Sequence, residues 1–173
     1  MVRLGNNMPE IIAGKNPVLE ALKAGRPINK ILLAKNIKND SAINEIIGLA
    51  RNKGIPVEFL ERQAIERLSL TSASQGVLAY AAAKDYVTLE ELLAIPKKTG
   101  EAALFCILDG IEDPMNLGAI LRTAGATGVQ GVIVRSRRAV GLTAIVAKAS
   151  AGAIEYVPVA RVVNIAETIE TLK

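Results

Sequence analysis

The chain has no histidine and only one cysteine among its 173 residues. A Ser-His-Asp triad, a histidine general base and a zinc site with histidine ligands are therefore excluded for this chain acting alone. Cys106 cannot form an internal disulfide, and its position in the apolar run ALFCIL favours burial over reactivity. These counts indicate no metal site.

Aromatic residues and long apolar runs are also scarce. With two phenylalanines, three tyrosines and no tryptophan, the chain is poorly suited to stack single-stranded bases on an aromatic platform. Half of the residues are hydrophobic, but no apolar run approaches the roughly 20 residues that a membrane span needs. The first residues, MVRLGNNMPE, lack the apolar core of a signal peptide. We therefore expect a folded cytoplasmic protein that does not enter a membrane.

The net charge of +4 is distributed unevenly along the chain. Residues 1–38 contain seven basic and two acidic side chains, whereas the rest of the chain contains 14 basic and 15 acidic ones. Such an asymmetry suggests a polyanionic partner for the N-terminal end. A solvated, lysine-rich surface explains the charge equally well.

The first half of the chain alternates between helix and strand patterns. Asn16 as N-cap and Pro17 at the first helical position predict a helix. A second helix is expected from Ser41 to the terminator Gly54. The segments KILLA, PVEFL and GVLAYAAA are typical of short strands. We expect a small α/β/α domain over residues 1–84.

The second half starts a different pattern. Residues 85–100 predict a linker, because a short helix with a capping box is followed by the polar stretch IPKKTGE. In residues 101–173, helices separate the apolar strands ALFCIL, GVIVR and EYVPV, as in a parallel sheet. Three strands leave this sheet with open edges, so either a partner subunit completes it or the natural protein continues beyond Lys173, and we expect the second.

The segment DPMNLGAILRTA predicts a helix with two separate stripes. The apolar positions follow the spacing of a core-facing side: Leu117, Ile120, Leu121, Ala124 and Gly128. Gly118, Arg122 and Gly125 form the second stripe, where a ligand or another backbone can approach the guanidinium closely. The alternative is an exposed arginine beside glycines that serve helix packing.

These segments resemble a known family. DPMNLGAILRTAGATGVQGVIV and AVGLTAIVAKASAGAIEYVPVARVVNIAETI are similar to the first part of the catalytic domain of the SpoU (TrmH) family of RNA ribose 2'-O-methyltransferases. IIAGKNPVLEALKAGRPINKILLAKN and SQGVLAYA resemble the substrate-binding domain of that family, which is similar to ribosomal protein L30e. The domain order is like that of bacterial enzymes that methylate a guanosine of 23S rRNA.

The resemblance implies an α/β fold with a small L30e-like α/β/α domain and an incomplete parallel-sheet domain of the trefoil-knot (SPOUT) type. It also implies an S-adenosylmethionine cofactor and a homodimer. Arg122 and Asn116 match the first catalytic motif, and Arg122 takes the place of the proposed catalytic arginine. The family proposal makes this arginine the general base, although a guanidinium stays protonated in water. Binding of the phosphate next to the target ribose is an equally good interpretation, so both roles remain open.

The charge surplus and the resemblance together predict the RNA contacts of the first domain. The expected RNA-binding residues are Lys15, Asn16, Arg26, Lys30, Lys35 and Gln75. Ser74 stands where many members of the family have histidine.

Two later motifs of the family, which form most of its cofactor pocket, do not occur in the sequence. The resemblance therefore implies no cofactor-binding residue in this chain, and S-adenosylmethionine binding is expected to need motifs beyond Lys173. We expect the 173 residues alone to be inactive. The rival interpretation is a non-catalytic RNA-binding or assembly protein.

Overall fold

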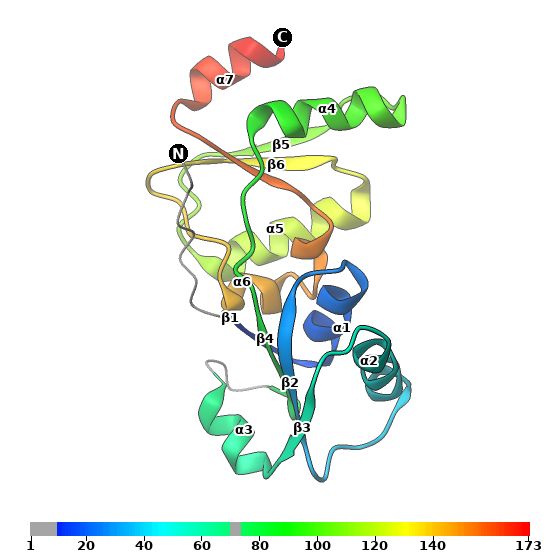
Figure 1. Ribbon diagram of the computed structural model, residues 1–173. Coiled ribbons are helices and arrows are strands. Elements are labelled where there is room, and N and C mark those ends of the chain that lie inside the picture. The colour runs from blue at the N-terminus through cyan, green and yellow to red at the C-terminus, as the bar shows by residue number, and fades with distance from the viewer. Residues whose placement is uncertain (1–9, 70–73) are drawn as a thin grey trace, which may run out of the picture.

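The computed structural model describes residues 10–69 and 74–173, which form two α/β units (Figure 1). The elements of the first unit are β1 (Glu10–Ala13), α1 (Lys15–Lys23), β2 (Ile28–Ala34), α2 (Ser41–Asn52), β3 (Val57–Leu60), α3 (Arg62–Leu68) and β4 (Val77–Ala81). Those of the second are α4 (Leu89–Thr99), β5 (Phe105–Leu108), α5 (Pro114–Thr127), β6 (Gly131–Arg135), α6 (Ala144–Ala149), the 3-10 turn η1 (Ala153–Glu155), β7 (Val159–Val162) and α7 (Ile165–Leu172).

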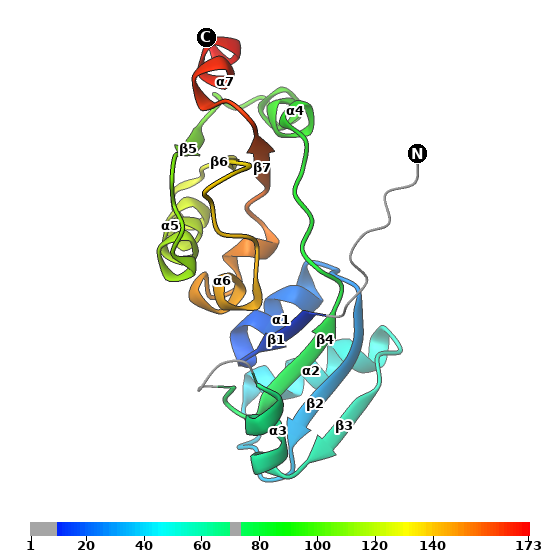
Figure 2. The ribbon, with the colours of Figure 1, turned by 90° about the vertical axis from the view of Figure 1, so that its left-hand side faces the viewer.

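The first unit is a four-stranded sheet between helices, in the strand order β1-β4-β2-β3. Only β2 and β3 are parallel, and the other pairs are antiparallel. Apolar side chains of α1 and α2, such as Leu22 and Ile46, pack with Ile31 on one face, whereas Ile65 of α3 packs with Leu78 on the other. The predicted α/β/α arrangement is confirmed (Figure 2).

The start of α1 differs from the prediction. The helix begins at Lys15, and its N-cap is Gly14 instead of Asn16. Gly14 has a φ of 108°, a conformation that side-chain-bearing residues rarely adopt, and it turns the chain sharply from β1 into the helix. Pro17 is therefore the third residue of the helix, where its missing N–H costs nothing because N–H groups of the first turn have no partner within the helix.

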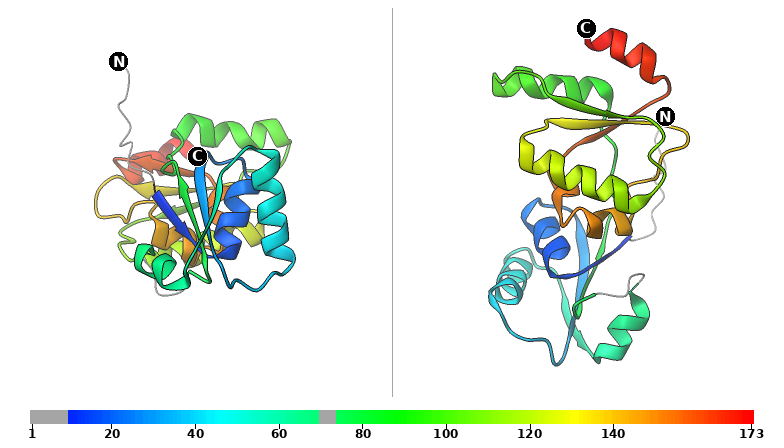
Figure 3. Two further views of the ribbon diagram at one scale, coloured as in Figure 1. Left: turned by 60° about the horizontal axis from the view of Figure 1, so that its bottom comes forward. Right: turned by 180° about the vertical axis from the view of Figure 1, so that it is seen from behind.

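The second unit is a parallel sheet in the order β5-β6-β7. Helices α5 and α6 cover the face toward the first unit, and α4 and α7 cover the other (Figures 1 and 3). Successive residues of β6 serve the two faces: Val132 packs against α5, while Ile133 packs with Leu92 of α4. The α/β class with a parallel sheet is confirmed.

The prediction of a strand at EYVPV was wrong in position. Glu155 belongs to η1, and β7 begins only at Val159, after Pro158. The reason is tertiary, because the side chains of Glu155 and Tyr156 are bound to the first unit.

The prediction of a linker over residues 85–100 was wrong for most of its length. The capping box of Thr88 and Glu91 starts a helix that continues through IPKKT to a left-handed Gly100. Leu92 of this helix is fully buried, and a Cβ on Gly131 of β6 would lie 2.2 Å from one of its methyl groups. Helix α4 is therefore a packed part of the second unit.

Neither a membrane span nor a metal-binding cluster is found in the described parts of the chain. No helix there is both long and apolar enough to cross a bilayer. No group of three histidine, cysteine, aspartate or glutamate side chains is placed to bind a metal ion.

Candidate functional site

Arg122 lies on the outer surface of α5. The side chain is exposed, and it has no hydrogen bond or ion pair with any residue that the structure describes. The helix beneath it is held firmly: Asp113 caps its N-terminus, Pro114 occupies its first position, and Leu117 and Leu121 are buried. The guanidinium is therefore available to a ligand on a rigid support.

The glycines beside Arg122 face other helices. A Cβ on Gly118 would lie 2.3 Å from the Cβ of Ala149 in α6, and one on Gly125 would lie 3.4 Å from the Cβ of Ala153. The hypothesis that these glycines clear space for a ligand is wrong. Gly118 lets α5 pack closely on α6, and Gly125 faces η1 at ordinary contact distance, as the alternative interpretation has it.

Asn116 does not point the same way as Arg122. Six residues of an α-helix place two side chains about 120° apart around its axis. Both residues are exposed, and the structure does not bring their side chains together. The backbone N–H groups of Met115 and Asn116 donate to the carboxylate of Asp113. This carboxylate already occupies the position that an anion would take at the N-terminus of the helix.

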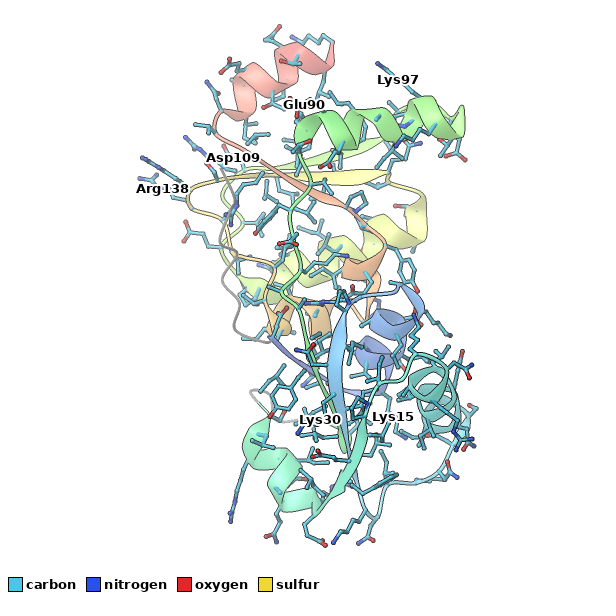
Figure 4. The ribbon with its side chains drawn as sticks, viewed as in Figure 1. Lys15, Lys30, Glu90, Lys97, Asp109 and Arg138 are labelled. Carbon is cyan, nitrogen blue, oxygen red and sulfur yellow. The ribbon has the colours of Figure 1, made fainter. Side chains whose placement is uncertain are left out.

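Three arginines lie at the end of β6 and just after it, and sequence reasoning missed them. Arg135 lies 3.6 Å from Asp109 of the neighbouring loop, whereas Arg137 and Arg138 are exposed and have no ionic partner in the described part of the chain. Arg138 has a φ of 55°, which is rare outside glycine. The side chain projects from the edge of the molecule (Figure 4). Three arginines within four residues at the carboxyl end of a parallel strand were the available signal.

The predicted RNA residues near the start of α1 lie close together. The carboxamide oxygen of Gln75 accepts a hydrogen bond from the backbone N–H of Lys15 at 3.3 Å, and Asn16 is exposed beside it. The Lys15 ammonium contacts Asp40 and, with the N–H of Ile43, holds the pKa of that carboxyl below its ordinary value. Lys15, Asn16 and Gln75 thus form one polar group on the surface.

The other predicted lysines are paired within the first unit. Lys30 lies 3.2 Å from Glu58, and Lys35 lies 2.8 Å from Glu61, with all four side chains largely exposed. Lys30 lies on the face of the sheet that α3 covers, beside Tyr80 and Leu68, whereas Lys15 lies on the opposite face, where it contacts Asp40 before α2; both lysines are labelled in Figure 4. Ser74 is buried, and its hydroxyl accepts a hydrogen bond from the N–H of Gly76 at 3.2 Å. It has a structural role in the turn before β4.

Arg26 is not an RNA-binding residue in this structure. Its side chain is only 4% exposed, and its guanidinium donates to the carbonyl of Ala82 at 2.9 Å and to the carboxylates of Glu10 and Glu155. The distance to Glu155 is 2.8 Å. The prediction of an RNA contact was wrong because Arg26 joins the two units, with every edge of its guanidinium already engaged.

A second polar contact joins the units close to Arg26. The hydroxyl of Tyr156 donates to Glu20 of α1 at 2.7 Å, and this hydrogen bond, with some burial, raises the pKa of Tyr156 to about 12. Lys84, in the extended connection between the units, donates to the backbone carbonyl of Glu155 at 3.1 Å. Burial raises the pKa of Glu10, although Arg26 opposes the shift.

The chain matches two family models, one over most of the first unit and one over the second unit from just before β5, with α4 outside both matches. The model described as RNA 2'-O ribose methyltransferase substrate binding matches residues 11–87. The model described as SpoU rRNA Methylase family matches residues 103–173. The two matches together cover most of the chain.

Curated relatives carry the same assignment. A Bacillus subtilis protein, YacO, assigned to the TrmH family of tRNA/rRNA methyltransferases, is 44% identical over 164 residues, which are 95% of this chain and 65% of YacO. A Staphylococcus saprophyticus protein with the same family assignment is 49% identical over 163 residues, or 94% of this chain and 65% of that protein. The chain thus spans 65% of the length of these relatives.

Solved structures share the fold. The SpoU methyltransferase AviRb from Streptomyces viridochromogenes superimposes with a TM-score of 0.69 at 20% identity, over 95% of this chain and 57% of that one. An AdoMet-bound rRNA methyltransferase from Sinorhizobium meliloti has a TM-score of 0.70 at 23% identity, over 94% of this chain and 57% of that one. At these identities the likeness concerns the fold alone. On the family models and the curated relatives, this chain belongs to the SpoU (TrmH) family of RNA methyltransferases.

Proposed function

We propose that the protein methylates a ribose 2'-hydroxyl of RNA with S-adenosylmethionine as methyl donor, and that its substrate is a guanosine of 23S rRNA. RNA and methyl transfer are supported by the family and by the curated relatives. The description of the substrate-binding model supports the ribose 2'-oxygen. The 23S rRNA and the guanosine rest on the resemblance in domain order, as does the homodimer.

S-adenosylmethionine, when bound, supplies a methyl group that its sulfonium already activates. The described residues at the carboxyl edge of the second sheet do not fit this cofactor. Asp113 caps the amides of α5, and the arginines after β6 are exposed and positively charged like the sulfonium. We therefore assign no described residue to cofactor binding. The chain's own share is to bind RNA, align the hydroxyl and exclude competing nucleotides.

Arg122 binds a phosphate next to the target ribose in this proposal. The single observation that carries it is an exposed guanidinium, without a partner among the described residues, on a helix held in place by the close contact of Gly118 with Ala149. An exposed guanidinium stays charged at neutral pH, so it cannot accept the proton of the hydroxyl. It can form two hydrogen bonds to a phosphate, which fix the neighbouring ribose.

The remaining RNA contacts come from both units. Lys15, Asn16 and Gln75 supply a polar group on the first unit that can recognise an unpaired nucleotide. Arg137 and Arg138 supply the unpaired positive charge that binds the backbone. RNA that binds both groups would extend from the first unit to the second sheet.

The test is to express the coding sequence as it stands in its genome in a bacterium without its own enzyme of this type, and to map 2'-O-methylated positions in the rRNA. We expect one modified guanosine in 23S rRNA, a weaker signal with Arg122→Lys, and loss of the signal with Arg122→Ala. Absence of any new methylated ribose contradicts the proposal.

The second candidate is a non-catalytic RNA-binding or assembly protein. One observation favours it, namely that the described residues include no group suited to the cofactor. Calorimetric titration of the 173-residue chain with S-adenosylmethionine separates the two. We expect no measurable binding by this chain, and micromolar affinity would show that a pocket exists without further segments.

A further inference from the structure

Four charged side chains from separate segments meet between the two units. They are Glu10 of β1, Arg26 before β2, Lys84 of the connection and Glu155 of η1, and we refer to them as the interdomain cluster. Arg26 is 4% exposed and Glu155 is 2% exposed at the side chain. Glu155 is the member that the second unit contributes, and its two cationic partners come from the first unit and the connection.

The interdomain cluster fixes the relative orientation of the two units as well as holding them in contact. The guanidinium is planar, and its three bonded edges must meet the carbonyl of Ala82, the carboxylate of Glu10 and the carboxylate of Glu155 at once. A rotation of one unit against the other would remove Glu155 from both of its cations. The connection over residues 82–86 has no helix or strand of its own, so it does not set this orientation by itself.

A second contact links the same units closer to Arg122. Gly152, which follows α6 with a φ of 94°, lies so near α1 that a Cβ there would be 2.6 Å from the Cβ of Glu20. Glu20 also accepts the hydrogen bond of Tyr156. On its other side, α6 packs on α5 through the contact of Ala149 with Gly118.

These contacts form a continuous path between the two parts of the proposed RNA site. Helix α1 begins with Lys15 and Asn16, and its later turn touches the segment after α6. Helix α6 in turn touches the helix that presents Arg122. The path contains close backbone contacts, which allow little adjustment. Figure 3 shows α1, α6 and α5 as successive layers between the sheets.

We propose that the interdomain cluster fixes the distance between the RNA-binding group of the first unit and Arg122, and thereby selects which nucleotide is methylated. RNA that is held at Lys15, Asn16 and Gln75 then presents to Arg122 only the ribose that lies a fixed number of nucleotides away along the strand. Arg26 and Glu155 are positioning residues in this scheme, because neither touches the RNA. The choice of nucleotide rests on the proposed function, but the fixed orientation of the two units can be tested without RNA.

The first experiment measures the geometry of the chain by small-angle X-ray scattering. Glu155→Gln removes the charge that Arg26 of the first unit and Lys84 of the connection both face, with little change in size. We expect a larger maximum dimension and a broader distance distribution, together with faster proteolysis in the segment 82–86. Glu58→Gln is the matched control, because it breaks the exposed pair with Lys30 inside the first unit. Scattering curves of Glu155→Gln and the parent chain that superimpose overturn the proposal.

The second experiment maps methylated riboses in rRNA for the same variants in the coding sequence expressed in bacteria. We expect Glu155→Gln to spread methylation from one position to its neighbours, at least tenfold above their background, and Glu155→Asp to restore the single position. If Glu155 only stabilises the fold, Glu155→Gln will reduce methylation at the original nucleotide without methylating its neighbours. That result overturns the proposal. No methylation by the parent chain would contradict the proposed function and leave the scattering result in force.

A stability check keeps the scattering test decisive. If Glu155→Gln lowers the melting temperature so far that the chain is unfolded at 25 °C, the double variant Lys84→Met with Tyr156→Phe replaces it. These two side chains are partly exposed; Lys84→Met loses two contacts with Glu155, and Tyr156→Phe loses the hydrogen bond to Glu20. The expected result and the overturning result are the same as for Glu155→Gln.

Discussion

The basic side chains proposed to contact RNA differ between the two units. In the first unit, the four basic residues predicted to bind RNA all face carboxylates: Lys15, Arg26, Lys30 and Lys35. In the second unit, Arg122, Arg137 and Arg138 are exposed without an ionic partner among the described residues. The positive excess lies in the first unit, but the uncompensated arginines around the candidate site lie in the second.

The difference shows that net charge by segment is a weak guide to a nucleic-acid surface. A cation that already faces a carboxylate gains less from a phosphate, because the new contact replaces an existing one. A cation without a partner gains the full interaction and releases a counterion from the RNA. Whether a cation already faces a carboxylate therefore matters more than the number of cations in a segment. Four pairs of measurements test this view.

The largest effect is expected for Arg26→Met. Removing one member of a buried ionic group leaves Glu155 and Glu10 without their main partner, which costs roughly 3–5 kcal/mol in the free energy of unfolding. Arg62→Met, which breaks an exposed pair with Glu66, should cost less than about 1 kcal/mol. Urea denaturation followed by circular dichroism measures both. Equal losses would show that Arg26 is an ordinary surface residue.

The next effect concerns RNA affinity. Arg137→Ala with Arg138→Ala and Lys30→Ala with Lys35→Ala remove the same charge from the second and the first unit. We expect the arginine pair to weaken RNA binding by about tenfold to a hundredfold at 0.1 M salt and to reduce the slope of log K against log salt by roughly 1.5. The lysine pair should change affinity by less than about threefold, since both lysines face glutamates. If the lysine pair weakens RNA binding more than the arginine pair in a filter-binding titration, the RNA surface lies on the first unit.

A smaller effect is expected from the glycines of α5. Gly118→Ala forces a methyl group against Ala149 and should cost about 1–3 kcal/mol of stability. Gly125→Ala meets only ordinary contacts and should be neutral or stabilise the helix by up to about 1 kcal/mol. Thermal unfolding by calorimetry separates the two variants. A stable Gly118→Ala would mean that α5 and α6 are not held as described.

The smallest effect is a pH dependence at Tyr156. Its pKa of about 12 lies above the ordinary value of 10, so the fold favours the neutral phenol. The stabilisation is complete below pH 10 and is lost as the pH rises through 12. Ultraviolet titration of tyrosinate should show one tyrosine that ionises late, and Glu20→Gln should shift it toward pH 10. An unshifted titration would show that the hydrogen bond between the units is absent in solution.

Much of the local structure could be predicted from short-range patterns. Helix α2 begins at Ser41, as predicted, because Asp40 accepts a hydrogen bond from the N–H of Ile43. The buried side of α5 is close to the predicted apolar stripe, with Leu117, Leu121 and Ala124 in the core. These features depend on residues at most a few turns apart, so a periodic pattern carries them.

Helix α4 and β7 show where such patterns fail. The polar stretch IPKKT is helical because the capping box starts the helix and Leu92 anchors it on the sheet at Gly131. The expected strand at EYVPV is shifted because Glu155 and Tyr156 are bound by the first unit. In both cases a distant partner decides the outcome, and a local pattern contains no information about it.

The sequence by itself determined the family, the order of the two units, the α/β class and the helix that carries Arg122. The α/β class and that helix depend on residue type and spacing along the chain, whereas the family and the order of the units come from the resemblance of whole segments. Only the tertiary structure decided that Arg26 joins the units, that Gly118 serves helix packing and that Arg137 and Arg138 have no ionic partner among the described residues. Arg26 and Glu155 lie 129 residues apart, and no rule of spacing pairs one carboxylate among 17 with one cation among 21. Such a pairing depends on burial and orientation, which exist only once both units have folded and met.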